Sequence, residues 1–97
     1  MATYITLLKY TEQGIKDIKN SPGRLDSARK AWKAAGGELK SFHLTLGRYD
    51  ALVISELPDD ATAARLALAT GSLGNVTTET LRAFGEDEFR KIIASLP

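Results

Sequence analysis

The sequence predicts a small α+β domain of the ferredoxin-like type, with the order βαββαβ and a C-terminal helix. Two β-type runs flank a turn at Gly47, and a strand-like and a helix-like segment lie on each side of this hairpin. The 97 residues, of which 43% are hydrophobic and 26% charged, suffice for one core. We expect one domain over residues 1–97, with an antiparallel four-stranded sheet in the order 4-1-3-2.

The first part of the chain predicts a strand, a short irregular or helical piece and a helix. Residues 3–10 alternate between two sets of side chains and are rich in β-branched and aromatic residues, which favours a strand. Ser21-Pro22 is typical of a helix start, with Ser as the N-cap, and Gly36-Gly37 ends this helix. Trp32 recurs at helical spacing with smaller apolar residues, so we expect it in the core.

A β-hairpin follows, with strands over about 38–46 and 49–57. Gly47-Arg48 fits a two-residue type II′ loop, because that turn requires glycine at its first position. This loop would place Leu44 opposite Ala51.

Side-chain alternation then divides the hairpin between two faces of the sheet. One face is wholly apolar and suits a cover of helices: Phe42, Leu44, Leu46, Ala51 and Val53. The other face mixes polar and apolar groups: Ser41, His43, Thr45, Asp50, Leu52, Ile54 and Glu56. This mixture favours a face that a second subunit covers or that lines a cavity, and many sheets of this topology pair into a dimeric barrel.

The last part of the chain predicts a helix, a strand and a final helix. Pro58-Asp59-Asp60 opens the first of these helices, which has Ala61, Ala64 and Leu68 on one side and ends at Gly71. Residues 75–83 are rich in threonine and favour the fourth strand. Residues 86–88 place acidic groups on the first turn of the final helix. Its apolar stripe consists of Phe89, Ile92, Ile93 and Leu96.

A set of short motifs along nearly the whole chain resembles the GYD domain family. These are Tyr10-Thr11, Gln13-Gly14-Ile15, Ser21-Pro22, Gly36-Gly37, Leu46-Gly47-Arg48-Tyr49-Asp50, Pro58-Asp59 and residues 74–84. The family takes its name from a Gly-Tyr-Asp signature, into which this chain inserts Arg48. The resemblance implies a dimeric α/β-barrel. It implies little about chemistry, because the family is largely without assigned function and the fold hosts many activities.

Composition narrows the classes of function. A formal net charge of +1 gives no reason to expect a nucleic acid or an anionic membrane as partner. The absence of cysteine excludes disulfides and thiolate chemistry, and a single histidine excludes a multi-histidine metal centre within one chain. We expect no cofactor and no bound metal. With no signal-like or membrane-spanning run, we expect a cytoplasmic protein.

His43 and Asp50 form the sharpest candidate pair for catalysis, because a carboxylate beside an imidazole can orient it as a general acid or base. The alternative is structural: His43 would fill a half-polar interface, and Asp50 would bond to the backbone of the turn.

Two classes of function therefore remain. The first is a homo-oligomeric binding or regulatory module that takes a small apolar ligand, and we prefer it. The second is a cofactor-free enzyme, similar to barrel monooxygenases or isomerases, that uses His43 and Asp50. The candidates for the lining of a ligand pocket are Tyr4, Thr6, Ser41, His43, Thr45 and Tyr49.

Overall fold

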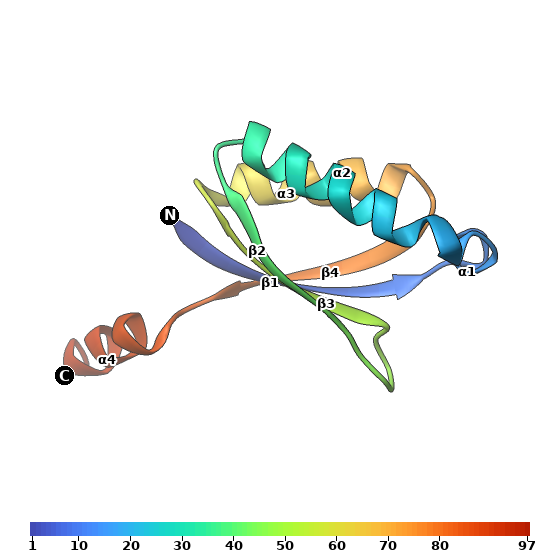
Figure 1. Ribbon diagram of the computed structural model, residues 1–97. Coiled ribbons are helices and arrows are strands. Elements are labelled where there is room, and N and C mark those ends of the chain that lie inside the picture. The colour runs from blue at the N-terminus through green and yellow to red at the C-terminus, as the bar shows by residue number, and fades with distance from the viewer.

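The computed structural model describes residues 1–97 and consists of an antiparallel sheet with two long helices on one face (Figure 1). The elements are β1 (Ala2–Tyr10), α1 (Glu12–Lys16), a 3-10 turn η1 (Ile18–Asn20), α2 (Ser21–Ala34), β2 (Glu38–Leu44), β3 (Ala51–Leu57), α3 (Asp60–Ser72), β4 (Val76–Ala83) and α4 (Glu86–Ala94). The sheet order is β2-β3-β1-β4, so β1 and β3 are central as predicted. The α+β, ferredoxin-like class is confirmed.

Residues at the ends of α2 and α3 explain where these two helices begin and end. Pro22 lies in the first turn of α2, where its missing N–H costs nothing, and Gly36 adopts a φ of 90° just beyond the end of that helix. The N-cap of α2 is Asn20, one residue before the Ser21 expected from the sequence. At α3, the Asp59 carboxylate accepts a hydrogen bond of 2.8 Å from the Thr62 backbone N–H.

The hairpin has the predicted register, with Leu44 opposite Ala51, but its strands end at these two residues. Only the bond from Thr45 N to Asp50 O, at 2.9 Å, extends the pairing further. The expected two-residue turn is therefore replaced by a longer connection over residues 45–50, in which Leu46 is 99% exposed and Gly47 has a φ of 112°. The expected two-residue turn and the expected place of Leu46 on the helix-covered face are therefore wrong.

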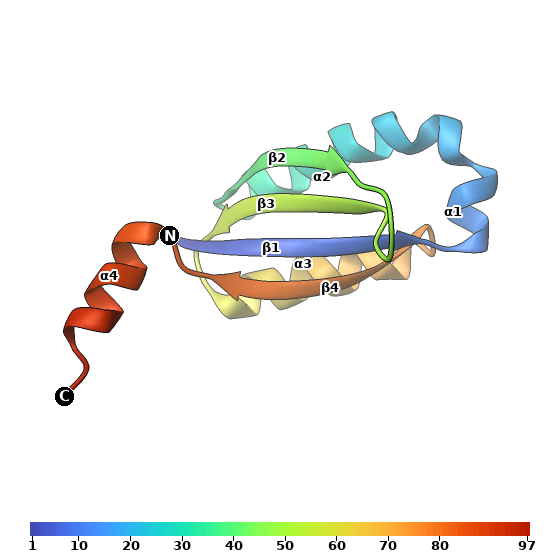
Figure 2. The ribbon, with the colours of Figure 1, turned by 90° about the horizontal axis from the view of Figure 1, so that it is seen from below.

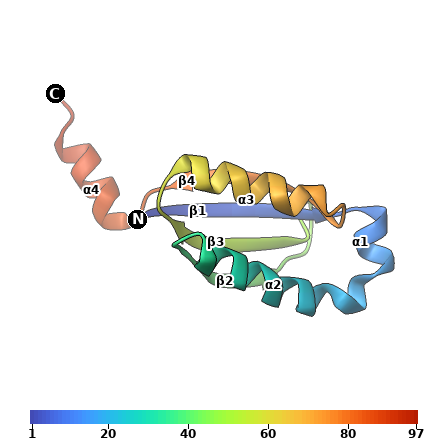
Figure 3. The same ribbon diagram turned by 90° about the horizontal axis from the view of Figure 1, so that it is seen from above.

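The core lies between the sheet and the helices α2 and α3, which run side by side above it (Figure 3). Its buried members are Tyr4, Trp32, Leu39, Val53, Leu57, Ala63 and Leu66, so the prediction for Trp32 is confirmed. A bulge between Leu39 and Ser41 lets both Leu39 and Phe42 pack on this side, although they are an odd number of residues apart.

The orientation of α3 differs from the sequence prediction. Its buried residues are Thr62, Ala63 and Leu66, whereas Leu68 is 76% exposed. The apolar stripe expected at Ala61, Ala64 and Leu68 is therefore on the outer side, because this alanine-rich helix has little contrast in hydropathy between its faces.

The last helix, α4, extends beyond the end of the sheet (Figures 1 and 3). None of its residues is buried. No helix of the protein is both long and apolar enough to cross a membrane.

Candidate interaction site

The face of the sheet opposite α2 and α3 has no helix over it (Figure 2). We call it the open face. Register places Ile5 of β1 between Ile54 of β3 and Leu81 of β4, and it places Leu7 opposite Leu52. Because side chains alternate along strands, these five aliphatic residues lie together on the open face. They form an apolar centre that spans three strands.

The connection over residues 45–50 lies across one end of the open face (Figure 2). The Tyr49 hydroxyl donates a hydrogen bond of 2.6 Å to the Glu79 carboxylate on β4, and the Lys9 ammonium lies 5.5 Å from the centre of the Tyr49 ring. The hydrogen bond to Glu79 raises the pKa of Tyr49. Thr45 supports this connection, since its hydroxyl donates to the Tyr49 carbonyl at 2.7 Å.

The structure gives the Asp50 carboxylate a partner other than His43. One of its oxygens accepts a hydrogen bond of 2.8 Å from the backbone N–H of Tyr10, the last residue of β1. The Asp50 N–H donates to the Leu8 carbonyl at 2.8 Å. The carboxylate and the backbone N–H of Asp50 are therefore both hydrogen-bonded to the backbone of β1. His43 is exposed opposite Leu52, and no hydrogen bond or ion pair joins it to Asp50.

The six residues expected to line one pocket lie in three places. Tyr4 and Thr6 are buried on the helix-covered side of the sheet. Ser41 and His43 lie on the open face, and Thr45 and Tyr49 lie in the connection that follows β2. Tyr4 and Thr6 line the cavity between the sheet and the helices, whereas the other four residues do not.

Tyr4 is hydrogen-bonded to the start of α3. Its hydroxyl donates to the carboxylate of Asp60 in the first turn of α3. This hydrogen bond, together with burial and the nearby negative charge, raises the pKa of Tyr4 to about 12.

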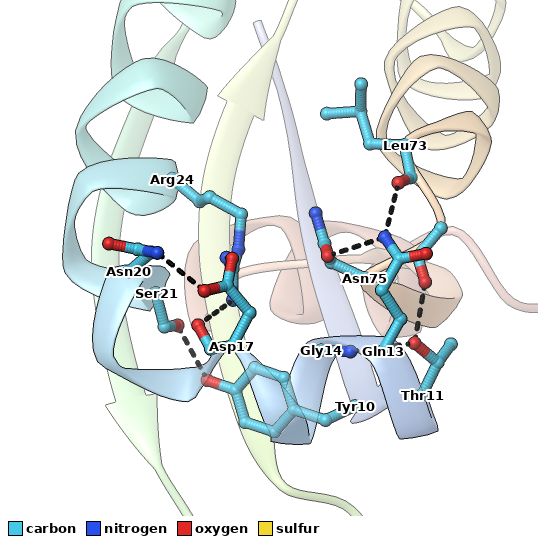
Figure 4. Close-up of polar contacts among 11 residues, drawn as sticks. Tyr10, Thr11, Gln13, Gly14, Asp17, Asn20, Ser21, Arg24, Leu73 and Asn75 are labelled. Atoms are coloured by element: carbon cyan, nitrogen blue, oxygen red, sulfur yellow. Dashed lines mark hydrogen bonds and ion pairs between the residues drawn. The ribbon is translucent and has the colours of Figure 1, made fainter.

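Several residues of the sequence motifs meet at the junction of the β1–α2 and α3–β4 connections (Figure 4). The Thr11 side chain bonds to both connections, since its hydroxyl donates to the Gly74 carbonyl at 2.6 Å and accepts from the Gly14 N–H at 3.1 Å. The Gln13 amide nitrogen donates to the Leu73 carbonyl at 3.2 Å and to the Asn75 side chain at 3.0 Å. The motifs at these positions therefore join two connections that are distant in sequence.

The same junction explains the glycine at position 14. A Cβ atom there would lie 2.0 Å from the Asn75 carbonyl oxygen, closer than any side chain allows. Beside it, the hydroxyls of Tyr10 and Ser21 lie 3.0 Å apart and tie the end of β1 to the start of α2 (Figure 4).

The helix α4 carries the second unpartnered apolar surface. Its first turn is fixed by the Glu88 carboxylate, which accepts from the Gly85 N–H at 3.2 Å and lies 3.4 Å from the Arg82 guanidinium. The predicted stripe is present but exposed: Phe89, Ile92, Ile93 and Leu96. Figure 1 shows α4 displaced from the sheet toward the side opposite α2 and α3, which is the side of the open face.

The arrangement of ionisable groups offers no metal centre, because no three His, Asp or Glu side chains cluster suitably. The open face and α4 instead present apolar surfaces next to a few charges. Exposed apolar patches of this kind are often sites of interaction.

Comparison with known proteins agrees with the sequence motifs. The model of the GYD domain family matches residues 4–93. A relative from Thermus thermophilus, described as a glutamine synthetase and cystathionine beta-lyase binding protein, is 32% identical over 84 residues, which cover 86% of this chain and 88% of that protein. No solved structure matches this chain significantly. The chain belongs to the GYD domain family.

Proposed function

We propose that this GYD domain is a homo-oligomeric binding module with a regulatory role, in which the open faces of two copies pack together as a dimeric α/β barrel. The observation that carries the proposal is the apolar centre of the open face at Ile5, Leu7, Leu52, Ile54 and Leu81. Burying aliphatic side chains yields about 25 cal/mol per Å² of apolar area removed from water. A second copy is a suitable cover because its own open face has the same aliphatic centre.

The position of α4 supports a second copy as the occupant. The helix extends from the end of β4 and lies on the open-face side, where a second sheet would be placed (Figure 1). Its stripe of Phe89, Ile92, Ile93 and Leu96 lacks a cover within its own chain. Packing of α4 against the second copy would bury this stripe together with the open face.

The mass of the protein in solution tests this proposal. Leu81→Asp places a charge on the open face, whereas Leu68→Asp makes the same change on the outer side of α3, and both leucines are exposed in the single chain. We expect light scattering at micromolar concentration to give a dimer or larger for wild type and Leu68→Asp, and a monomer for Leu81→Asp. A monomeric wild type, or identical behaviour of the two variants, would remove the proposal.

The proposed partner of the assembled module is a metabolic enzyme. This part rests on the printed description of the Thermus relative, which names two enzymes that it binds. Purified glutamine synthetase and cystathionine beta-lyase, each titrated calorimetrically with the module, provide the test. We expect saturable binding to at least one of the two enzymes. If neither titration gives a heat of binding, an enzyme partner of this kind is contradicted.

A further inference from the structure

The helix-covered side of the sheet contains a cavity of about 570 Å³ between the strands and the helices α2 and α3. The cavity opens to solvent beside exposed residues such as Ala31 and Leu73. Its volume lies within the range of about 300–1,000 Å³ that is typical of ligand pockets. The space remains because small side chains line both helices, including Ala28 and Ala31 on α2 and Ala63 and Ala67 on α3. This cavity lies on the opposite side of the sheet from the open face.

Two buried polar atoms of cavity-lining residues lack a partner. They are the Trp32 indole nitrogen Nε1 and the Ser55 hydroxyl oxygen, in residues that are 8% and 1% exposed. Buried donors and acceptors are nearly always paired in proteins, because leaving one unmet is costly. The two side chains line a largely apolar cavity, and an occupant with an oxygen atom would pair these buried atoms once the side chains turn toward it.

The charges around the cavity restrict the occupant. Arg24 is the one lining residue with a permanent charge, and its guanidinium lies 2.9 Å from the Asp17 carboxylate (Figure 4). No lining charge is therefore left to neutralise an ionic ligand, which would lose its hydration on entry. At the same end of the cavity, the Tyr10 and Ser21 hydroxyls are paired with each other.

We propose that this cavity binds a small, uncharged and largely apolar molecule that carries a hydroxyl or carbonyl oxygen. On binding, the Trp32 side chain turns so that its indole donates a hydrogen bond to that oxygen, and Ser55 contributes a second hydrogen-bonding group. The aliphatic and alanine side chains contact the rest of the ligand. This inference does not rest on self-association, because the cavity is formed within one chain and faces away from the open face.

Cavity-filling variants test where the ligand binds. The probe is 2-naphthol, an uncharged aromatic alcohol, and equilibrium dialysis measures its binding. Ala67→Leu fills space in the cavity, whereas Ala64→Leu makes the same change at an exposed position of α3 that does not line it. We expect Ala67→Leu to weaken binding by about tenfold or more and Ala64→Leu to leave it unchanged. If Ala67→Leu fails to fold, Ala28→Leu and exposed Ala34→Leu on α2 form the second pair.

Polar variants test how the ligand is recognised. We expect wild type to prefer 2-naphthol over naphthalene, and Trp32→Phe and Ser55→Ala to reduce this preference roughly three- to tenfold, as for loss of one hydrogen bond. Circular dichroism shows whether each variant remains folded. A wild type that binds neither compound overturns the proposal, since the cavity then holds only water. Equal binding by Ala67→Leu and Ala64→Leu, or a preference unchanged in both polar variants, also overturns it.

Discussion

The Asp50 carboxylate and the Tyr10 backbone N–H form a hydrogen bond of 2.8 Å between the β2–β3 connection and the end of β1. The two residues are 40 positions apart in the sequence. A second bond of 2.8 Å, from the Asp50 N–H to the Leu8 carbonyl, fixes the same connection to the same strand. Asp50 therefore orients residues 45–50 over the open face, which makes the last residue of the family signature a determinant of structure.

Asp50→Ala should lower the free energy of unfolding by about 1–3 kcal/mol, because it leaves the Tyr10 N–H without its charged acceptor. Asp50→Asn retains an acceptor oxygen and should cost less. Lys33→Ala, at an exposed position of α2 away from the open face, should stay within about 0.5 kcal/mol of wild type. Urea denaturation measures all three variants, and an equal loss for Lys33→Ala and Asp50→Ala would show that the Tyr10 contact is unimportant.

The sequence predicted the hairpin register but not this contact. The pairing of Leu44 with Ala51 was expected from a two-residue loop at Gly47-Arg48, and it holds because the longer connection over residues 45–50 is centred on the same two positions. The partner of Asp50, however, depends on how far β1 extends beside β3, and no local pattern encodes that length. The sequence also does not indicate that β2 ends at Leu44 and that β3 begins only at Ala51.

Gly14→Ala should destabilise the fold strongly, by roughly 2 kcal/mol or more, because its Cβ would lie 2.0 Å from the Asn75 carbonyl oxygen. Gly23→Ala is the matched control, since a Cβ at that position of α2 meets nothing within 4 Å. It should stabilise α2 by about 0.5–1 kcal/mol through higher helix propensity. Thermal melting should therefore move in opposite directions for the two variants, and parallel changes would mean that the junction can adjust.

The cavity and the position of α4 could not be predicted from the sequence, because both depend on how helices pack. Trp32 was correctly expected in the core, but a helical pattern does not reveal whether the space beside an indole is filled. The alanines of α3 have similar hydropathy on every side, so the burial of Ala63 rather than Ala64 depends on packing against the sheet. The stripe of α4 was recognised, but periodicity does not tell whether a helix packs on its own chain or on another.

The Tyr4–Asp60 contact predicts a loss of stability at high pH. The pKa of Tyr4 is about 12 in the folded protein against an ordinary value of 10.0, so the folded state holds one more proton than the unfolded state between these values. The stabilisation is therefore complete below pH about 10 and is lost as the pH rises toward about 12. Urea denaturation across this interval should show a steeper decline in the free energy of unfolding for wild type than for Tyr4→Phe, which lacks the titrating hydroxyl.

Tyr49→Phe is the control, because its partner Glu79 is exposed, and this variant should retain most of the wild-type slope. Parallel declines for wild type and Tyr4→Phe would show that Tyr4 ionises normally, and that Asp60 does not hold its hydroxyl.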